Sequence, residues 1–70
     1  MSNRKDPVKE GLVLRQLTVR PSEKRPGDGI GWYEGMAIIV KDVHLPPGKF
    51  ELMNLVILNV KERYAFAKVI

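Results

Sequence analysis

Short apolar runs separated by prolines and glycines form most of this chain. All six glycines and all five prolines lie between positions 7 and 48, so few windows before residue 49 could hold a helix. The runs between them are rich in valine, isoleucine, leucine and aromatic side chains, which is typical of short strands joined by turns. The pattern therefore predicts an all-β protein.

Five strands are expected between these turn signals. Glu34-Gly35 has the composition of a tight hairpin loop, and Pro47-Gly48 has that of a type II turn. In the first strand the apolar phase shifts by one residue between Leu14 and Leu17, which indicates a β-bulge near residues 15–16. The expected strands cover residues 12–20, 30–33, 36–41, about 50–60 and 64–70.

The fourth of these strands is apolar on both faces, although a strand with one face in water should alternate apolar and polar residues. One face holds Phe50, Leu52, Val56, Leu58 and Val60, and the other holds Met53, Leu55 and Ile57. A helix over 51–60 is the competing interpretation, but the valine and isoleucine content favours a strand. If the first face fills the interior, the second is an interface for a protein partner or for self-association, or is covered by residues 1–11.

Strand edges decide the expected architecture. Five antiparallel strands in 70 residues need closure, because an open sheet would leave unpaired edges in water. A small OB-like barrel meets this need with five strands. We therefore expect residues 8–70 to form a five-stranded antiparallel OB-like β-barrel, preceded by a basic N-terminal tail over residues 1–7.

Composition then limits the class of partner. The chain carries 12 lysines and arginines against eight acidic residues, and the excess leans toward its N-terminal third. A net charge of +4 suits a polyanion such as nucleic acid. The absence of cysteine excludes disulfides and thiolate metal sites. The polar N-terminus lacks the apolar segment of a secretory signal, and no apolar run could span a membrane, so a cytoplasmic protein without a membrane partner is expected.

Catalytic chemistry has few candidate groups in this sequence. His44 is the only histidine, and the hydroxyl nucleophiles are limited to Ser2, Ser22 and Thr18, which do not make a nucleophile–base pair with an orienting residue. The glycines at 27, 29 and 31 lack the following helix and lysine of a phosphate-binding loop. We therefore expect no enzymatic activity, no cofactor and no metal.

Five segments follow one another along the chain, namely GDGIG at 27–31, YEG at 33–35, MAIIV at 36–40, PPG at 46–48 and KERYAFAKVI at 61–70. Taken in this order, they resemble the TRAM domain. The likeness runs from Pro7 to Ile70 and is to the small stand-alone archaeal TRAM proteins in particular. The sequence departs from the family at Trp32, where a basic residue is common, and at Met36 and Ile39, where phenylalanine is usual. The resemblance implies a five-stranded OB-like barrel that binds RNA, and stand-alone members act as RNA chaperones.

An OB-type barrel binds its ligands across the second and third strands, between the loops that follow the first and fourth strands. The candidate RNA-binding residues on these elements are Arg20, Lys24, Arg25, Trp32, Tyr33, Lys41, Lys61, Arg63, Tyr64 and Phe66. Trp32 and Tyr33 are neighbours on a strand and point to opposite faces, so one of them belongs to the core. Phe66 lies between two alanines, and its burial preference favours the core over a stacking surface.

Together these features predict a small RNA-binding protein without sequence specificity, an RNA chaperone whose partner is tRNA, rRNA or mRNA. Three alternatives stay open. The protein could be a structural or accessory subunit of the ribosome or of another ribonucleoprotein, an adaptor between proteins, or a barrel that binds double-stranded DNA in chromatin.

Overall fold

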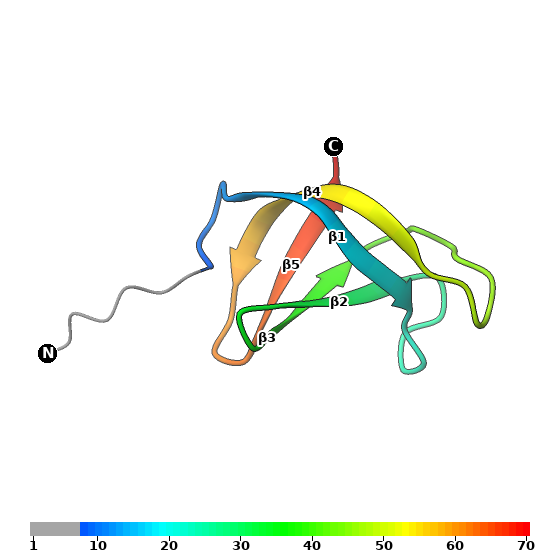
Figure 1. Cartoon of the computed structure of the whole chain (residues 1–70). Helices are drawn as coiled ribbons and strands as arrows, with labels where there is room; N and C mark the ends of the chain where they lie inside the picture. The colour runs from blue at the N-terminus through cyan, green and yellow to red at the C-terminus, as the bar shows by residue number, and fades with distance from the viewer. Residues whose placement is uncertain (1–7) are drawn as a thin grey trace, which may run out of the picture.

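The computed structural model describes residues 8–70 and shows a closed barrel of five strands, with no helix in that part of the chain (Figure 1). The strands are β1 (Val13–Pro21), β2 (Gly29–Tyr33), β3 (Met36–Val40), β4 (Glu51–Val60) and β5 (Tyr64–Val69). They follow one another around the barrel in the order β1-β2-β3-β5-β4. The predicted OB-like barrel is thus confirmed, and the predicted tail over residues 1–7 lies outside the described residues. Because residues 8–70 form only strands and loops, they contain no helix that could cross a membrane.

One pair of neighbouring strands is parallel, which corrects the expectation of antiparallel pairing throughout. Strand β3 runs parallel to β5, with Ala37 beside Tyr64 and Val40 beside Ala67, whereas the other four pairs are antiparallel. The odd number of strands explains this. In a closed ring with an odd number of strands, direction cannot alternate at every step, so at least one pair must be parallel.

The β-bulge predicted in the first strand is confirmed. Leu14 pairs with Leu55 and Leu17 pairs with Met53, so β1 has one more residue than β4 between these two pairs. Gln16 takes a positive φ of 55°, and its amide donates a 2.9 Å hydrogen bond to the Asn54 side-chain oxygen instead of to a strand. A bulge bends the strand that contains it, and β1 goes on from β4 to pair with β2 at its other end.

The interior of the barrel is small and wholly apolar. Its buried residues are Val8, Leu14, Val19, Ile38, Val40, Leu55, Ile57, Ala65 and Ala67. Val8 precedes the first strand, and the segment that carries it is held on β4 by two hydrogen bonds. The Gly11 amide donates to the Ile57 carbonyl (2.8 Å), and the Ile57 amide donates to the Leu12 carbonyl (2.9 Å). Residues 8–12 therefore close one part of the core.

The inner face of β4 is the second of the two that the sequence left open, the one that holds Leu55 and Ile57. Leu55 and Ile57 are 0% and 1% exposed inside the barrel, whereas Phe50, just before the strand, and Leu52 are 70% and 57% exposed. A second bulge at Leu58 then returns Val60 to the inner side, because Ile57 pairs with Ala67 while Asn59 pairs with Phe66. The hypothesis of an interface through Met53, Leu55 and Ile57 is therefore wrong, and so is the competing helix. Leu55 and Ile57 fill the core, and Met53 packs against it.

Two glycines of the 27–31 segment have a packing role. Gly29 and Gly31 are buried on the inner side of β2, where β1 crosses it closely. A Cβ atom on Gly31 would lie 2.7 Å from the Thr18 carbonyl oxygen, and one on Gly29 would lie 2.8 Å from a Val43 methyl. The Thr18 backbone cannot move aside cheaply, and the valine side chains around Gly29 are packed in the core, so both glycines serve barrel closure rather than phosphate binding.

The buried position of Leu55 and the exposed position of Leu52 lead to a test of the core. We expect Leu55→Ala to lower the free energy of unfolding by about 2–5 kcal/mol, the usual cost of removing a buried leucine side chain. Leu52→Ala makes the same chemical change on the same strand at an exposed position and should alter stability by no more than about 0.5 kcal/mol. Urea denaturation of both variants measures the difference, and equal losses would contradict the assignment of faces.

Candidate nucleic-acid interface

Strands β2, β3 and β5 present two rows of side chains on the outside of the barrel. Strand pairing places Trp32 beside Ala37 and Ala37 beside Tyr64, which makes the first row. The second row is Ile30, Ile39 and Phe66 in the same order. The residues between them, such as Ile38 and Ala65, point into the core. The outer face is therefore apolar and aromatic.

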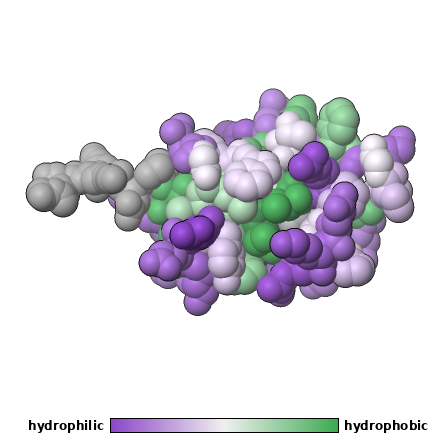
Figure 2. All heavy atoms as spheres, turned by 90° about the horizontal axis from the view of Figure 1, so that it is seen from below, coloured by the Kyte–Doolittle hydropathy of each residue, from purple (hydrophilic) through white to green (hydrophobic). Residues whose placement is uncertain are grey.

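This face forms the floor of a broad groove with a volume of about 1170 Å³. Ile30, Trp32, Ala37, Ile39 and Tyr64 line the floor, and the β1–β2 loop and the loop between β3 and β4 rise beside it. Seen from below, this side shows apolar side chains bordered by hydrophilic ones (Figure 2). Because pockets for small molecules usually have volumes of about 300–1,000 Å³, the groove is large enough for a segment of a polymer.

The positive charge of the protein is concentrated at this groove. Its lining holds five basic residues and one acidic residue, Glu23. The basic ones are Arg20, Lys24, Arg25, Lys49 and Arg63. Since the whole chain has 12 basic and eight acidic residues, the remainder holds seven of each sign and is neutral overall. The net charge of +4 is thus carried by the groove, which makes it an attractive surface for a polyanion.

Hydrogen bonds order the two loops beside the groove and join them to each other. Within the β1–β2 loop, the Ser22 amide donates to the Asp28 carbonyl (2.9 Å) and the Asp28 amide donates to the Arg25 carbonyl (2.9 Å). Asp28 Oδ1 accepts the Asp42 amide (3.0 Å), and the Gly27 carbonyl accepts the His44 amide (3.0 Å). The loop that carries Lys24 and Arg25 is therefore held in a defined position.

Most of the residues predicted to bind RNA do come together. Six of the ten line the groove, namely Arg20, Lys24, Arg25, Trp32, Arg63 and Tyr64. Lys41 and Phe66 adjoin it, with the Lys41 Nζ 5.4 Å from the centre of the Phe66 ring. The Phe66 ring meets the Tyr64 ring edge to face, with 5.4 Å between centroids. The expectation that Phe66 belongs to the core is thus wrong, because Ala65 and Ala67 occupy the interior on either side of it.

The structure separates the remaining two predicted residues from the groove. Tyr33 points inward and packs against the core, which confirms that Trp32 and Tyr33 point to opposite faces and that one of them belongs to the core. Tyr33 also lines a smaller cleft of about 760 Å³ between β1 and β2, where Arg20, Ile30 and Trp32 contribute as well. Lys61 is exposed on the β4–β5 turn but does not line the groove.

Sequence reasoning missed two prominent residues of the groove, Lys49 and Phe50. Both lie in the loop before β4, and Phe50 is 70% exposed. The sequence pattern places Phe50 on one apolar face of the fourth strand, because it extends the alternation of that strand backwards by one step. The turn at residues 46–49, closed by a 3.1 Å bond from the Lys49 amide to the Pro46 carbonyl, was the available signal that Phe50 belongs to a loop.

The acidic residues and the histidine of the described chain do not form a metal-binding cluster. His44 Nε2 lies 4.0 Å from Asp42 Oδ1, and both side chains are exposed. Within residues 8–70 there is no group of three or more histidine, cysteine and acidic residues placed to hold a metal ion.

No protein-family model matches the sequence, and no curated protein is significantly similar to it. The resemblance to TRAM domains therefore stays a prediction.

The bond between the two loops gives a second prediction. We expect Asp28→Ala to speed hydrogen exchange at the Asp42 amide, because that amide loses its acceptor, and to cost about 1 kcal/mol of stability. Asp28→Asn keeps an oxygen at this position and should keep most of the protection. Exchange followed by NMR measures both, and an unchanged rate in the alanine variant would show that the side chain does not hold the second loop.

Proposed function

We propose that this protein is a cytoplasmic RNA-binding protein that holds single-stranded RNA in the groove without sequence specificity and acts as an RNA chaperone. The observation that carries the proposal is the combination of an apolar, aromatic floor with the whole net positive charge of the chain. Single-stranded nucleic acids need both, because their bases stack on aromatic rings while their phosphates pair with lysine and arginine.

The chemistry of the floor supports an unpaired and sequence-tolerant ligand. Ile30, Ala37 and Ile39 offer no hydrogen-bonding side chain, so the edges of the bases find little to distinguish them. A duplex would present its phosphates to the basic loops and leave the apolar floor unused. RNA rather than DNA is favoured by the resemblance to TRAM domains, which covers residues 7–70.

Binding is also better supported than catalysis. Among the described residues that line the groove there is no histidine, and its serine, Ser22, already accepts a hydrogen bond from the Arg25 amide at 3.2 Å. Catalysis by a nucleophile requires an adjacent base within hydrogen-bonding reach. The groove offers positive charge and flat apolar surface, which are the properties of a binding site.

Salt dependence tests the proposal. If all five basic residues of the groove contact phosphates, the logarithm of the affinity for single-stranded RNA should fall with the logarithm of salt concentration with a slope of about −3.5. We expect Arg63→Ala to flatten this slope by about 0.7, which corresponds to one lost phosphate contact. Fluorescence anisotropy with a labelled RNA of about eight nucleotides, titrated from about 50 to 200 mM salt, measures both quantities.

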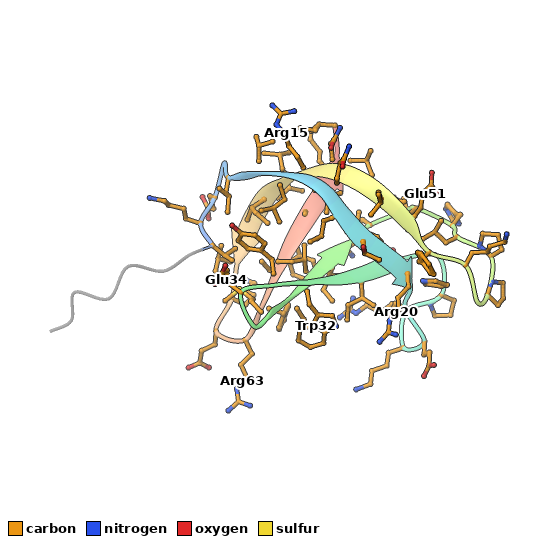
Figure 3. The ribbon with its side chains drawn as sticks, viewed as in Figure 1. Arg15, Arg20, Trp32, Glu34, Glu51 and Arg63 are labelled. Carbon is orange, nitrogen blue, oxygen red and sulfur yellow. The ribbon has the colours of Figure 1, made fainter. Side chains whose placement is uncertain are left out.

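Arg15→Ala is the matched control, because it removes the same charge from the opposite side of the barrel (Figure 3). Its slope should equal that of the wild type. Equal losses in both variants would mean that net charge alone attracts the RNA, and binding only to duplex DNA would favour a chromatin protein instead.

The β1–β2 loop gives a further test of the site. Changing Lys24 and Arg25 together to alanine should flatten the salt slope by about 1.4, for two lost phosphate contacts. Because both side chains are exposed, the melting temperature should stay close to that of the wild type. If affinity and slope both survive the double change, the loop is not part of the binding site.

A further inference from the structure

The floor of the groove has a gap at Ala37. Trp32 on β2 and Tyr64 on β5 lie in one row with Ala37 between them on β3. Because neighbouring strands lie about 4.8 Å apart, the backbones that carry the two aromatic residues are separated by roughly 10 Å. The alanine side chain is the smallest on this floor. Space therefore remains above it, between two aromatic side chains.

The next row shows what fills this space elsewhere on the same face. There Ile39 occupies the position between Ile30 and Phe66, so the sheet carries large side chains on all three strands. The Phe66 ring meets the Tyr64 ring at an interplanar angle of 89°, which restricts the orientation of Tyr64. The gap at Ala37 is thus closed on the side of this row, and one of its aromatic walls is supported.

The dimensions of the gap suit one flat ring. Two successive stacking steps of about 3.4 Å each place the outer rings of a three-ring stack about 7 Å apart. Rings that lean inward from backbones roughly 10 Å apart can reach that separation. Trp32 is 57% exposed and Tyr64 is 37% exposed, so each has a ring surface that lacks a partner within the described chain.

From this geometry we propose that one base of the bound RNA inserts between Trp32 and Tyr64 and rests on the methyl group of Ala37. The inference rests on the proposed function, because it assigns a position to one nucleotide within the same groove. The ligand is an unpaired nucleobase of any identity, since every base has two ring faces for stacking. Purines overlap the two side chains more fully than pyrimidines do, so adenine binds better than uracil.

Charges on both sides of the gap fit the two phosphates that flank such a base. Figure 3 shows Arg20, Trp32 and Arg63 projecting from the same side of the barrel, with Trp32 between the two arginines in this view. All three residues line the groove. One arginine is therefore available for the phosphate that precedes the inserted base, and the other for the phosphate that follows it. A base held in this way is unstacked from its neighbours, so the site selects unpaired segments of RNA.

Filling the gap tests the proposal without removing a charge or an aromatic ring. Ala37→Leu adds bulk on the outer face of β3, and Val69→Leu adds bulk at an exposed position on β5 that lines neither the groove nor the cleft between β1 and β2. We expect Ala37→Leu to weaken binding of an oligoadenylate of about eight nucleotides by about 5- to 150-fold, the range for one lost stacked base. The salt slope should stay near −3.5, because all the phosphate contacts remain. Val69→Leu should bind as the wild type does.

Trp32 provides a second and direct readout, since it is the only tryptophan in the chain. RNA binding should quench its fluorescence in the wild type and in Val69→Leu, and should quench it much less in Ala37→Leu. Wild-type affinity and quenching in Ala37→Leu would overturn the proposal, as would equal losses in both variants. Should Ala37→Leu fail to fold, an abasic oligonucleotide of the same length with the wild-type protein decides, because it keeps the phosphates and removes the bases. It should bind weakly without quenching, and undiminished affinity would overturn the proposal.

The same titrations separate the two proposals from each other. If the wild-type protein binds no RNA, the proposed function itself fails. If it binds RNA with the expected salt slope but Trp32 fluorescence does not change, only the inserted base is excluded.

Discussion

The rest of the structure depends on β1 pairing with two strands, first with β4 and then with β2. The bulge at Gln16 bends β1 within its pairing with β4, before β1 reaches β2, and the Asn54 side chain accepts the amide that the bulge leaves unpaired. Gly29 and Gly31 have no Cβ atom, which allows β2 to lie close against β1. Without this crossing the barrel could not close. Closure also brings the β1–β2 loop, with its basic side chains, to the edge of the β2–β3–β5 face.

The narrow interior of a five-stranded barrel explains why its outer face is aromatic. Along β2 two inward positions are glycines and the third is Tyr33 at the end of the strand, while Ile30 and Trp32 point outward. Along β5 the buried inward positions are alanines, while Tyr64 and Phe66 point outward. Small barrels must fill their interior with side chains that fit its width, so apart from Tyr33 the large residues of these two strands lie outside. A contiguous apolar surface of this kind usually marks a binding site.

Local signals in the sequence predicted the elements of the barrel well, but they did not fix the residues of the interior. The one-residue phase shift after Leu14 located the bulge, because a bulge is a local event. The sequence could not decide which face of β4 is inside, because both faces are apolar. Only the pairing of β4 with β1 in the closed barrel shows it. Phe66 was misplaced for a related reason. Average burial preference puts phenylalanine inside, whereas the width of this interior is set by closure, which no local pattern reveals.

In the proposed function, basic side chains on the loops and aromatic side chains on the strands contribute to RNA binding in different ways. The cations of the β1–β2 loop sit on backbone that Asp28 ties to the next loop, so their positions are set before a ligand arrives and less ordering is needed on binding. Trp32 and Tyr64 stand on paired strands, which fixes their spacing. Charge acts at a distance and mainly raises the rate of encounter, whereas short-range stacking mainly slows dissociation. An RNA chaperone needs fast encounter with many sequences and release from each of them. A groove with five cations and few stacking positions fits that requirement better than a deep specific pocket would.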